Sequence, residues 1–208
     1  MRVLEEDFWG ASSDWHFQHR RIVEYCPWNR PWENADIMTE RMVDLLNQQV
    51  PTGAKVLFTG DGALSHTAIL EWFPKLNFDI YWAVGNHDKC HKCQKGWAKT
   101  REMTLKQVPN VKAIEDEFIV KIGRHTVLAT HMPWLELSDE RHGIKYAEYR
   151  PKHKDYPGIS WMIGGHQHNE PQNKVQDRFI DVGWDPWGRA VEWKELEEII
   201  NEGAIPTK

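Results

Sequence analysis

The sequence has no stretch that is long and apolar enough to span a membrane, and no segment that resembles a signal peptide. A spanning helix needs about 20 predominantly apolar residues, and no run in these 208 residues approaches that length. The N-terminal stretch MRVLEEDFWGASSD contains acidic side chains where a signal peptide requires a basic start and an apolar core. The sequence therefore predicts a cytoplasmic protein that does not interact with membranes.

Cysteine is scarce, and positive charge is not in excess. Three cysteines, an odd number, argue against a disulfide framework and are typical of a reducing compartment. The formal net charge is −5, whereas affinity for duplex nucleic acid comes mainly from Lys and Arg contacts with phosphates. We therefore expect no strong binding to duplex nucleic acid, although this composition still allows a local basic patch.

Internal repeats, low-complexity segments and Gly/Ser linkers are also absent. A chain of this length can bury a sizeable core, so we expect a single domain over residues 1–208. The 12 tryptophans are more than such a length usually carries, and we expect most of them in the core or at its rim with hydrogen-bonded N–H groups. The alternative is a tryptophan-lined pocket for a planar ligand.

Short β-rich runs alternate with helical patterns along the chain. Apolar residues at three- and four-residue spacing predict a helix over 35–50, and shorter helices are expected over 67–73 and 194–201. Strands are predicted over 7–13, 55–59, 80–84, 117–122, 125–130, 160–163 and 178–182. Alternation early in the chain and hairpins later predict a layered α/β domain, with helices flanking a sheet or a pair of sheets. Residues 133–158 have no clear period and are expected to form a long, partly helical excursion over one edge.

Five short motifs each follow a predicted strand: Asp14-Trp15-His16, Gly60-Asp61, Gly85-Asn86-His87-Asp88, Thr130-His131 and Gly165-His166-Gln167-His168. In α/β sheets this edge is where ligands bind, because loops there converge without disturbing the core. Residues i and i+2 of an extended segment point to the same side, so Asp14 can face a common space with His16, as can His166 with His168.

The side chains of these motifs are oxygen and imidazole donors. Such a mixture suits Mn, Fe, Zn or Ni better than Mg or Ca, which prefer oxygen ligands alone. A glycine before each of Asp61, Asn86 and His166 permits a sharp exit from the strand and a close approach of the backbone to a ligand. A lone D-x-H is common at protein surfaces, a Gly-Asp is most often a turn, and a lone His131 is more often a core histidine than a ligand, whereas the pair His166 and His168 is a stronger signal. The ordered set at strand ends predicts a metal site.

The order D-x-H, G-D, G-N-H-D, a solitary H and G-H-x-H resembles that of the calcineurin-like metallophosphoesterases, with a match over residues 14–168. Residues 14–32, DWHFQHRRIVEYCPWNRPW, look like the D-x-H-F-G-H segment and following Arg-Pro of small single-domain bacterial and phage members. Residues 180–199 are similar to their closing strand and helix. The resemblance implies a four-layer α/β/β/α sandwich, two divalent metal ions and a phosphate-ester substrate. Mn²⁺ is the favoured ion, with Fe, Zn or Ni as alternatives, and nucleotides are among the candidate substrates.

The resemblance also implies a role for each matching residue. Seven residues are implied as ligands: Asp14, His16 and His168 for one metal, Asn86, His131 and His166 for the other, and Asp61 as a bridge between them. His87 would be the catalytic histidine beside the leaving group, with Asp88 orienting it or raising its basicity. Two cations about 3.5 to 4 Å apart can share a hydroxide and clamp a phosphate during in-line displacement, and a protonated His87 can donate to the leaving alkoxide.

Two further residues are candidates for substrate contact, and two positions depart from the family pattern. His19 and Arg30 are expected to contact phosphate, since Arg offers a planar fork for its oxygens; the alternative is that both are ordinary surface residues. Residues 62–65, GALS, stand where many relatives carry a bulkier hydrophobic residue, and Gln18 stands where close relatives have glycine. Neither departure supplies a metal ligand, so they bear on substrate fit more than on catalysis.

Cys90 and Cys93 form a C-x-x-C pair directly after the G-N-H-D motif. With Cys26 and His91 they would supply four donors for a structural zinc, and a zinc-stabilised nucleic-acid module would be built on such a site. A redox pair normally opens a helix after a strand, but here Lys89 and the metal motif occupy that junction. The favoured interpretation is two reduced cysteines in a loop.

The predicted function is therefore a dinuclear phosphoesterase that hydrolyses a small phosphodiester or phosphomonoester. One alternative is a nuclease on single-stranded nucleic acid, but such members usually add capping domains, and the 40 residues after His168 leave no room for one. The other alternative is a silent binding or scaffold module on the same fold. Such relatives typically lose ligands or the catalytic histidine, and none is missing here.

Overall fold

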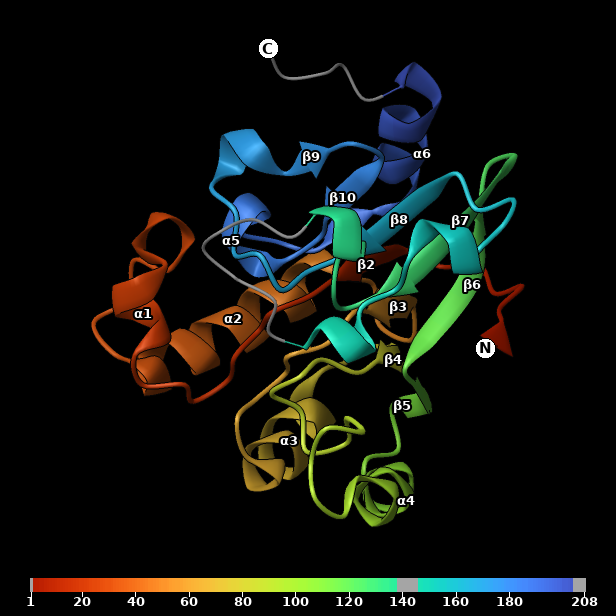
Figure 1. Cartoon of the computed structure of the whole chain (residues 1–208). Coiled ribbons are helices and arrows are strands. Elements are labelled where there is room, and N and C mark those ends of the chain that lie inside the picture. Colours follow the sequence, from red (N-terminus) through yellow and green to blue (C-terminus); the bar gives the residue numbers. More distant parts are fainter. Residues whose placement is uncertain (1, 138–145, 204–208) are drawn as a thin grey trace.

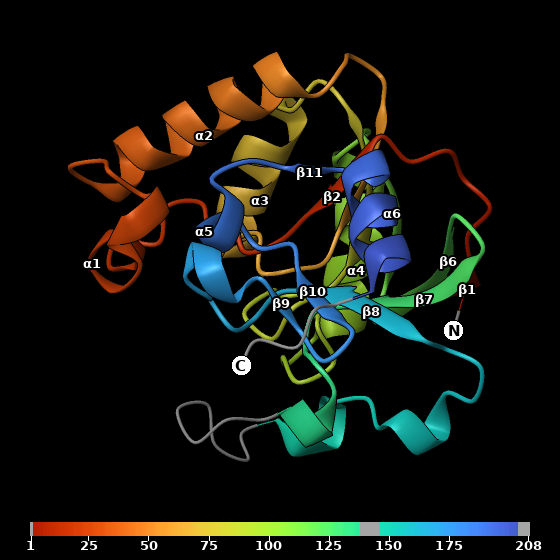
Figure 2. The same cartoon turned by 90° about the horizontal axis from the view of Figure 1, so that it is seen from above.

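The computed structural model describes residues 2–137 and 146–203, and two β-sheets form its framework (Figures 1 and 2). The first sheet has the order β11-β2-β3-β4-β5. The strand bounds are Val191–Glu192 for β11, Gly10–Ser12 for β2, Lys55–Phe58 for β3, Asp79–Ala83 for β4 and Val111–Glu115 for β5. Strands β2 to β5 are parallel, so their carboxyl ends lie at one edge, where the chain enters three of the predicted ligand motifs.

The second sheet has the order β1-β6-β7-β8-β10-β9. The strand bounds are Arg2–Val3 for β1, Glu117–Ile122 for β6, His125–Thr130 for β7, Trp161–Gly164 for β8, Phe179–Asp181 for β10 and Val175–Gln176 for β9. The β6-β7 pair is an antiparallel hairpin, whereas β7, β8 and β10 run parallel to one another. The carboxyl ends of β7 and β8 lead to His131 and His166, so this sheet carries the remaining motifs.

Apolar side chains fill the space between the two sheets and also cover the outer face of the first sheet. Leu57 and Ala83 from the first sheet pack in one buried cluster with Val127 and Ile163 from the second. Helix α6 (Trp193–Glu202) adds to this cluster and contacts β2, β11 and β6, so it closes one end of the space between the sheets.

Helices α2 (Ala35–Gln49) and α3 (His66–Trp72) cover the outer face of the first sheet (Figure 2). Helix α2 begins where the Asn34 side chain accepts hydrogen bonds from the backbone N–H groups of Asp36 and Ile37. Its buried face includes Met38 and Met42, which belong to the same cluster as Phe58 of β3 and Trp82 of β4. Helix α4 (Trp97–Gln107) packs beside α3 and β5.

Residues 133–137 and 146–159 cover the outer face of the second sheet, on the side opposite α2 and α3 (Figure 2). The segment contains the 3-10 turns η3 (Leu135–Leu137), η4 (Ala147–Tyr149) and η5 (His153–Asp155). Its Trp134 and Tyr156 pack on Leu128 and Met162. The predicted excursion thus covers a face of the sheet rather than an edge, because its aromatic side chains complete a small core there; residues 138–145 lie outside the described residues. The predicted four-layer α/β/β/α architecture is confirmed.

Short helical turns complete the fold. They are α1 (Ile22–Tyr25), η1 (Pro27–Asn29), η2 (Phe73–Lys75), η6 (Pro171–Asn173) and α5 (Trp184–Trp187). All predicted strands and helices are present, β6 and β7 with the predicted bounds and the others with shifted ones. The elements α4 and β5 were missed, and so were shorter ones such as β1, β9 and β11. Thr104 is the only buried residue of α4, and β5 is short, so neither shows a strong apolar period. No helix within residues 2–137 and 146–203 is long and apolar enough to cross a membrane.

The tryptophans are used mainly as core residues, as predicted. Trp15, Trp82 and Trp184 are fully buried and donate their indole N–H groups to Ser12 Oγ, Asp88 Oδ2 and the carbonyl oxygen of Asn29. In Trp72 and Trp134 the same group has no hydrogen-bond partner among the described residues.

Candidate metal centre

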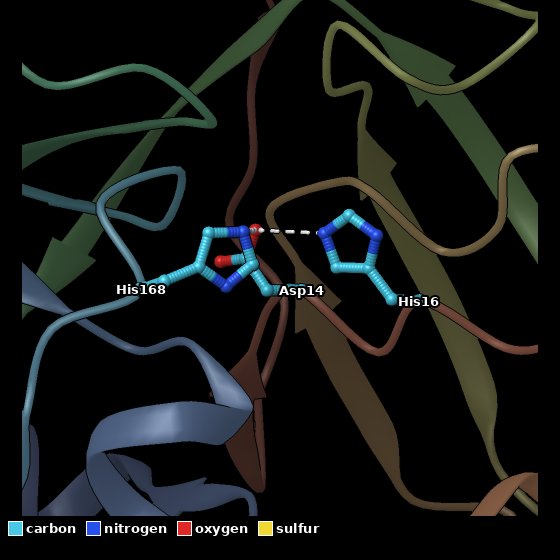
Figure 3. A group of neighbouring side chains, drawn as sticks. All are labelled: Asp14, His16 and His168. Atoms are coloured by element: carbon cyan, nitrogen blue, oxygen red, sulfur yellow. Dashed lines mark ion pairs between the residues drawn. The ribbon is translucent and has the colours of Figure 1, made fainter. Parts of the chain in front are cut away.

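The first group of predicted ligands comes together above the carboxyl ends of the strands (Figure 3). Asp14 and His16 follow β2, and His168 follows β8, yet their potential ligand atoms all lie within 4.8 Å of one another. Asp14 Oδ1 is 3.8 Å from His16 Nε2 and 3.8 Å from His168 Nε2. One carboxylate oxygen therefore faces two imidazole nitrogens, an arrangement that a cation can share.

Asp61 lies between this group and a second one. Its Oδ2 is 3.7 Å from His16 Nε2 and 3.2 Å from His131 Nε2. The ring of His131 lies edge-on to that of His166, with 5.2 Å between the ring centroids. Asn86 belongs to a turn that is hydrogen-bonded to Asp61, since the backbone N–H of His87 donates to Asp61 Oδ1 at 2.9 Å. The structure thus brings the predicted ligands of both positions to one place.

Five of the seven predicted ligands present a buried polar atom without a hydrogen-bond partner in the described part of the chain. These atoms are Asp14 Oδ1, His16 Nε2, Asp61 Oδ2, Asn86 Oδ1 and His131 Nε2. Native proteins leave few buried polar groups unsatisfied, and such exceptions require an explanation. Each of these atoms can act as a lone-pair donor, so the donor set fits divalent cations of the Mn, Fe, Zn or Ni type.

The electrostatics agree with a site built around ionised carboxylates. Burial raises the pKa of Asp61, but the neighbouring His131 and His16 outweigh it and hold the value well below its usual range. Burial likewise lowers the pKa of His131, but Asp61 outweighs it and raises the value to about 9. Asp61 is therefore a carboxylate at neutral pH despite its burial.

The backbone of the ligand turns differs from the extended form that we expected. Five predicted ligands have left-handed backbones: Asp14 (φ 55°), His16 (φ 49°), Asp61 (φ 56°), His166 (φ 75°) and His168 (φ 49°). The pairs Asp14/His16 and His166/His168 do converge, but through tight turns rather than along one strand face. Such conformations cost about 1–3 kcal/mol each and cluster at functional sites. Asp and His adopt left-handed conformations more readily than most residues, so the residue types at these positions were the indication of such turns in the sequence.

Two glycines make room for the buried carboxylates. A Cβ atom at Gly85 would lie 2.1 Å from Asp61 Oδ1, and one at Gly165 would lie 2.0 Å from Asp14 Oδ2. Both contacts are far inside van der Waals range. The glycines that precede Asn86 and His166 therefore admit the carboxylate of a neighbouring turn, in addition to permitting a sharp exit from the strand.

Asp88 does not hold His87 as expected. Its carboxylate accepts from the backbone N–H groups of Asp61 at 2.9 Å, Gly62 at 2.9 Å and Gly85 at 2.7 Å, and from the indole of Trp82 at 3.1 Å. Burial and the charge of Asp61 raise its pKa to about 7. Asp88 therefore ties two ligand turns together, and its lone pairs are already engaged by backbone donors.

His87 lies at the solvent side of the centre. Its side chain is 45% exposed, and Nε2 is 3.9 Å from Asp61 Oδ2. Its ring centroid is 5.6 Å from that of His16. The imidazole of His87 can thus reach a substrate bound at the centre, although it is not one of the buried side chains that line the centre.

The two predicted substrate contacts lie in different environments. The His19 ring is half buried, with Nδ1 3.3 Å from His16 Nδ1, and burial together with His16 lowers its pKa to about 4. Arg30 is fully buried and donates to the Asp185 carboxylate and to the backbone carbonyls of Asp14 and Trp15. The expected phosphate contact of Arg30 is therefore contradicted: its guanidinium faces the protein interior, beneath the centre.

Comparison with known proteins identifies the family. Residues 10–170 match the sequence profile of the calcineurin-like phosphoesterases, a range that includes all seven predicted ligands. The chain belongs to this family.

This calcineurin-like phosphoesterase is also similar to one protein in sequence and to another in structure. An uncharacterised protein of the archaeon Methanocaldococcus jannaschii is 38% identical over 80 residues, which are 37% of this chain and 44% of that protein. The chain therefore spans less than half the length of that relative. A solved structure of a protein of unknown function from Aquifex aeolicus superimposes with a TM-score of 0.66 at 17% identity, over 91% of this chain and 97% of that one. The second likeness shows a shared fold.

The C-x-x-C pair of this calcineurin-like phosphoesterase contributes to no candidate metal cluster within residues 2–137 and 146–203. Cys90 is buried beside Thr104, and burial raises the pKa of its thiol to about 12. Cys93 Sγ lies 3.5 Å from the carbonyl oxygen of Asn86. Both thiols are free in this structure and pack in the loop after the G-N-H-D motif.

Replacing Cys93 with serine tests that interpretation. We expect Cys93→Ser to retain the metal content and the melting temperature of the unchanged protein, because a hydroxyl can still donate to the Asn86 carbonyl oxygen. Elemental analysis and thermal unfolding measure both quantities. Loss of about one zinc per chain, together with a lower melting temperature, would instead identify a structural zinc at the pair.

Proposed function

We propose that this metal-dependent phosphoesterase hydrolyses a small phosphodiester or phosphomonoester, with nucleotides among the candidate substrates, and that it uses two divalent cations, Mn²⁺ being the favoured ion. The observation that carries the proposal is the set of buried lone-pair donors around Asp61 that have no hydrogen-bond partner within residues 2–137 and 146–203. Carboxylate, amide and imidazole donors converge there at the carboxyl edge of both sheets, where a substrate can reach them.

Asp14, His16 and His168 would hold one cation, and Asn86, His131 and His166 the other. Asp61 would bridge them, and its charge offsets their mutual repulsion. The cations, when bound, would supply Lewis acidity at the phosphoryl oxygens and activate a water molecule at neutral pH.

The chain itself would supply the acid and the orientation of the substrate. His87 lies partly in solvent and in reach of the centre, so its imidazolium can give a proton to the leaving oxygen. His19 lies against Nδ1 of His16 and is partly exposed, which suits contact with a phosphate oxygen. None of these residues would act as a nucleophile, so the proposed mechanism has no covalent phosphoenzyme.

Metal removal and reconstitution test the proposal. Protein treated with a chelator and then loaded with Mn²⁺ should hydrolyse a chromogenic diester or monoester, and the chelated protein should not. A screen of cyclic nucleotides, nucleoside monophosphates and dinucleotides would narrow the substrate. Faster release of nucleotides from single-stranded oligonucleotides than from small esters would favour the nuclease. Full metal binding without turnover of any substrate would favour a scaffold.

A further inference from the structure

A buried ion pair lies directly beneath one of the two candidate metal positions. Arg30 follows the turn η1, and Asp185 lies in α5, 155 positions further along the chain. Arg30 Nε donates to Asp185 Oδ1 at 2.7 Å, and Nη2 donates to Oδ2 at 3.0 Å. Both side chains are 0% exposed. The pair is therefore bidentate and fully removed from solvent.

Each partner of the pair also contacts a predicted ligand of the same metal position. Asp185 Oδ2 lies 2.7 Å from Nδ1 of His168. Arg30 Nη2 donates to the backbone carbonyl of Asp14 at 2.6 Å, and Nη1 donates to that of Trp15 at 3.2 Å. With Nδ1 of His168 engaged by a carboxylate, its Nε2 is directed toward Asp14 Oδ1, 3.8 Å away. The ion pair thus fixes the ring of one ligand and the turn that carries another.

Two ligands of the other position, His131 and Asn86, have separate supports, whereas the backbone N–H of His166 donates to Asp14 Oδ2 at 3.0 Å. Nδ1 of His131 pairs with the backbone carbonyl of Thr59 at 2.8 Å. The turns of Asp61 and Gly85 are held by the carboxylate of Asp88, and the carbonyl of Asn86 accepts from Gln94 at 2.8 Å. The hydrogen bonds described for Arg30 and Asp185 reach none of the groups that hold His131 and Asn86, so a change in the pair acts first on the position of Asp14, His16 and His168.

Stability alone does not explain such a pair. Desolvation of two charges offsets most of their attraction, and well-packed apolar residues in place of a buried ion pair are often neutral or stabilising. A carboxylate behind a ligating histidine, in contrast, fixes the tautomer and the ring orientation and raises the basicity of the ligand. The burial of Arg30 and Asp185 is therefore better explained by their positioning of Asp14 and His168 than by a gain in stability.

We infer that Arg30 and Asp185 are positioning residues for the metal position formed by Asp14, His16 and His168, and that the position of Asn86, His131 and His166 is maintained without them. The inference rests on the proposed use of two cations and deepens it, because it makes the two positions unequal. Removing the pair would convert a two-metal protein into one that fills a single position.

The variant Asp185→Asn tests the inference with small change in volume. An amide has one acceptor oxygen and cannot serve both Arg30 and His168 as the carboxylate does. Mn²⁺ binding to the full chain is measured by calorimetry, and coupling between two bound Mn²⁺ ions by electron paramagnetic resonance. We expect one site with unchanged affinity, one site weakened by about 10- to 100-fold, and loss of the coupled signal at limiting Mn²⁺.

Two further variants separate alignment from stability. Leu196→Ala removes a buried side chain of α6 between the sheets, away from the centre, and should lower the melting temperature while both Mn²⁺ affinities are kept. The double variant Arg30→Met with Asp185→Leu removes both charges, and it should keep cooperative unfolding yet show the same single weakened site. If Asp185→Asn does not fold, this double variant carries the test.

The outcomes are distinct from those that test catalysis. Equal weakening of both sites in the Asp185 variant, or two sites with unchanged affinity, would overturn the inference, and so would fewer than two Mn²⁺ ions on the unchanged protein. Two ions bound without turnover of any ester would overturn the proposed catalysis alone, because every measurement here reads binding rather than activity.

Discussion

The variant Asp61→Asn is expected to lose most of its bound metal and to lower kcat/KM by more than about 100-fold. Loss of a group that merely supports a ligand typically costs 10- to 100-fold in metal affinity or activity, and Asp61 faces both candidate positions directly. The amide keeps one oxygen to accept from the backbone N–H of His87, so the turn itself is retained. The substitution removes the negative charge of Asp61 and one of its two oxygen donors.

Metal content by elemental analysis and steady-state kinetics on the same preparation measure the effect of Asp61→Asn. Asp116→Asn is a suitable control, because this carboxylate pairs with Arg101 and Lys92 and lies outside the described metal clusters. The control should keep both its metal and its turnover. An Asp61 variant that retains two tightly bound ions would exclude the bridging role.

The variant His87→Ala is expected to lower kcat/KM by about 10²- to 10⁴-fold while its metal content stays unchanged. The side chain is partly exposed and stands at the rim, and the backbone N–H that donates to Asp61 Oδ1 is retained in the variant. If His87 protonates the leaving oxygen, the loss should be larger for an alkyl ester than for a nitrophenyl ester, whose leaving group needs little help from an acid.

Comparison of esters with good and poor leaving groups therefore distinguishes an acid from a ligand. His153→Ala serves as the control, since this histidine is similarly exposed and pairs with Glu136. Equal losses for both esters, accompanied by a drop in bound Mn²⁺, would show that His87 contributes to metal binding instead.

The order of motifs along the sequence predicted which side chains would meet, because each motif follows a strand and parallel strands end at one edge. It did not predict how they meet. The left-handed turns at Asp14 and His168 depend on the fit of neighbouring turns, such as the space that Gly165 leaves for the Asp14 carboxylate. Local spacing contains no information on that fit.

The errors at Arg30 and Asp88 have a common physical cause. Both are charged residues next to recognisable motifs, and charge near an active site suggested contact with substrate or with the catalytic histidine. The actual partner of Arg30 is a carboxylate 155 residues away, and those of Asp88 include the backbone N–H groups of Asp61 and Gly62 in another turn. Such partners are set by tertiary packing, so a single sequence gives no spacing that would reveal them.

The ion pair between Arg30 and Asp185 also bears on when the centre can form during synthesis. The backbone N–H of His166 donates to Asp14 Oδ2 across 152 residues, and Arg30 meets Asp185 across 155. Contacts of such separation form slowly and late in folding. If Arg30 and Asp185 support the position of Asp14, His16 and His168 as inferred, that position would be complete only after Asp185 has left the ribosome, and a metal ion bound there would favour the finished fold by mass action.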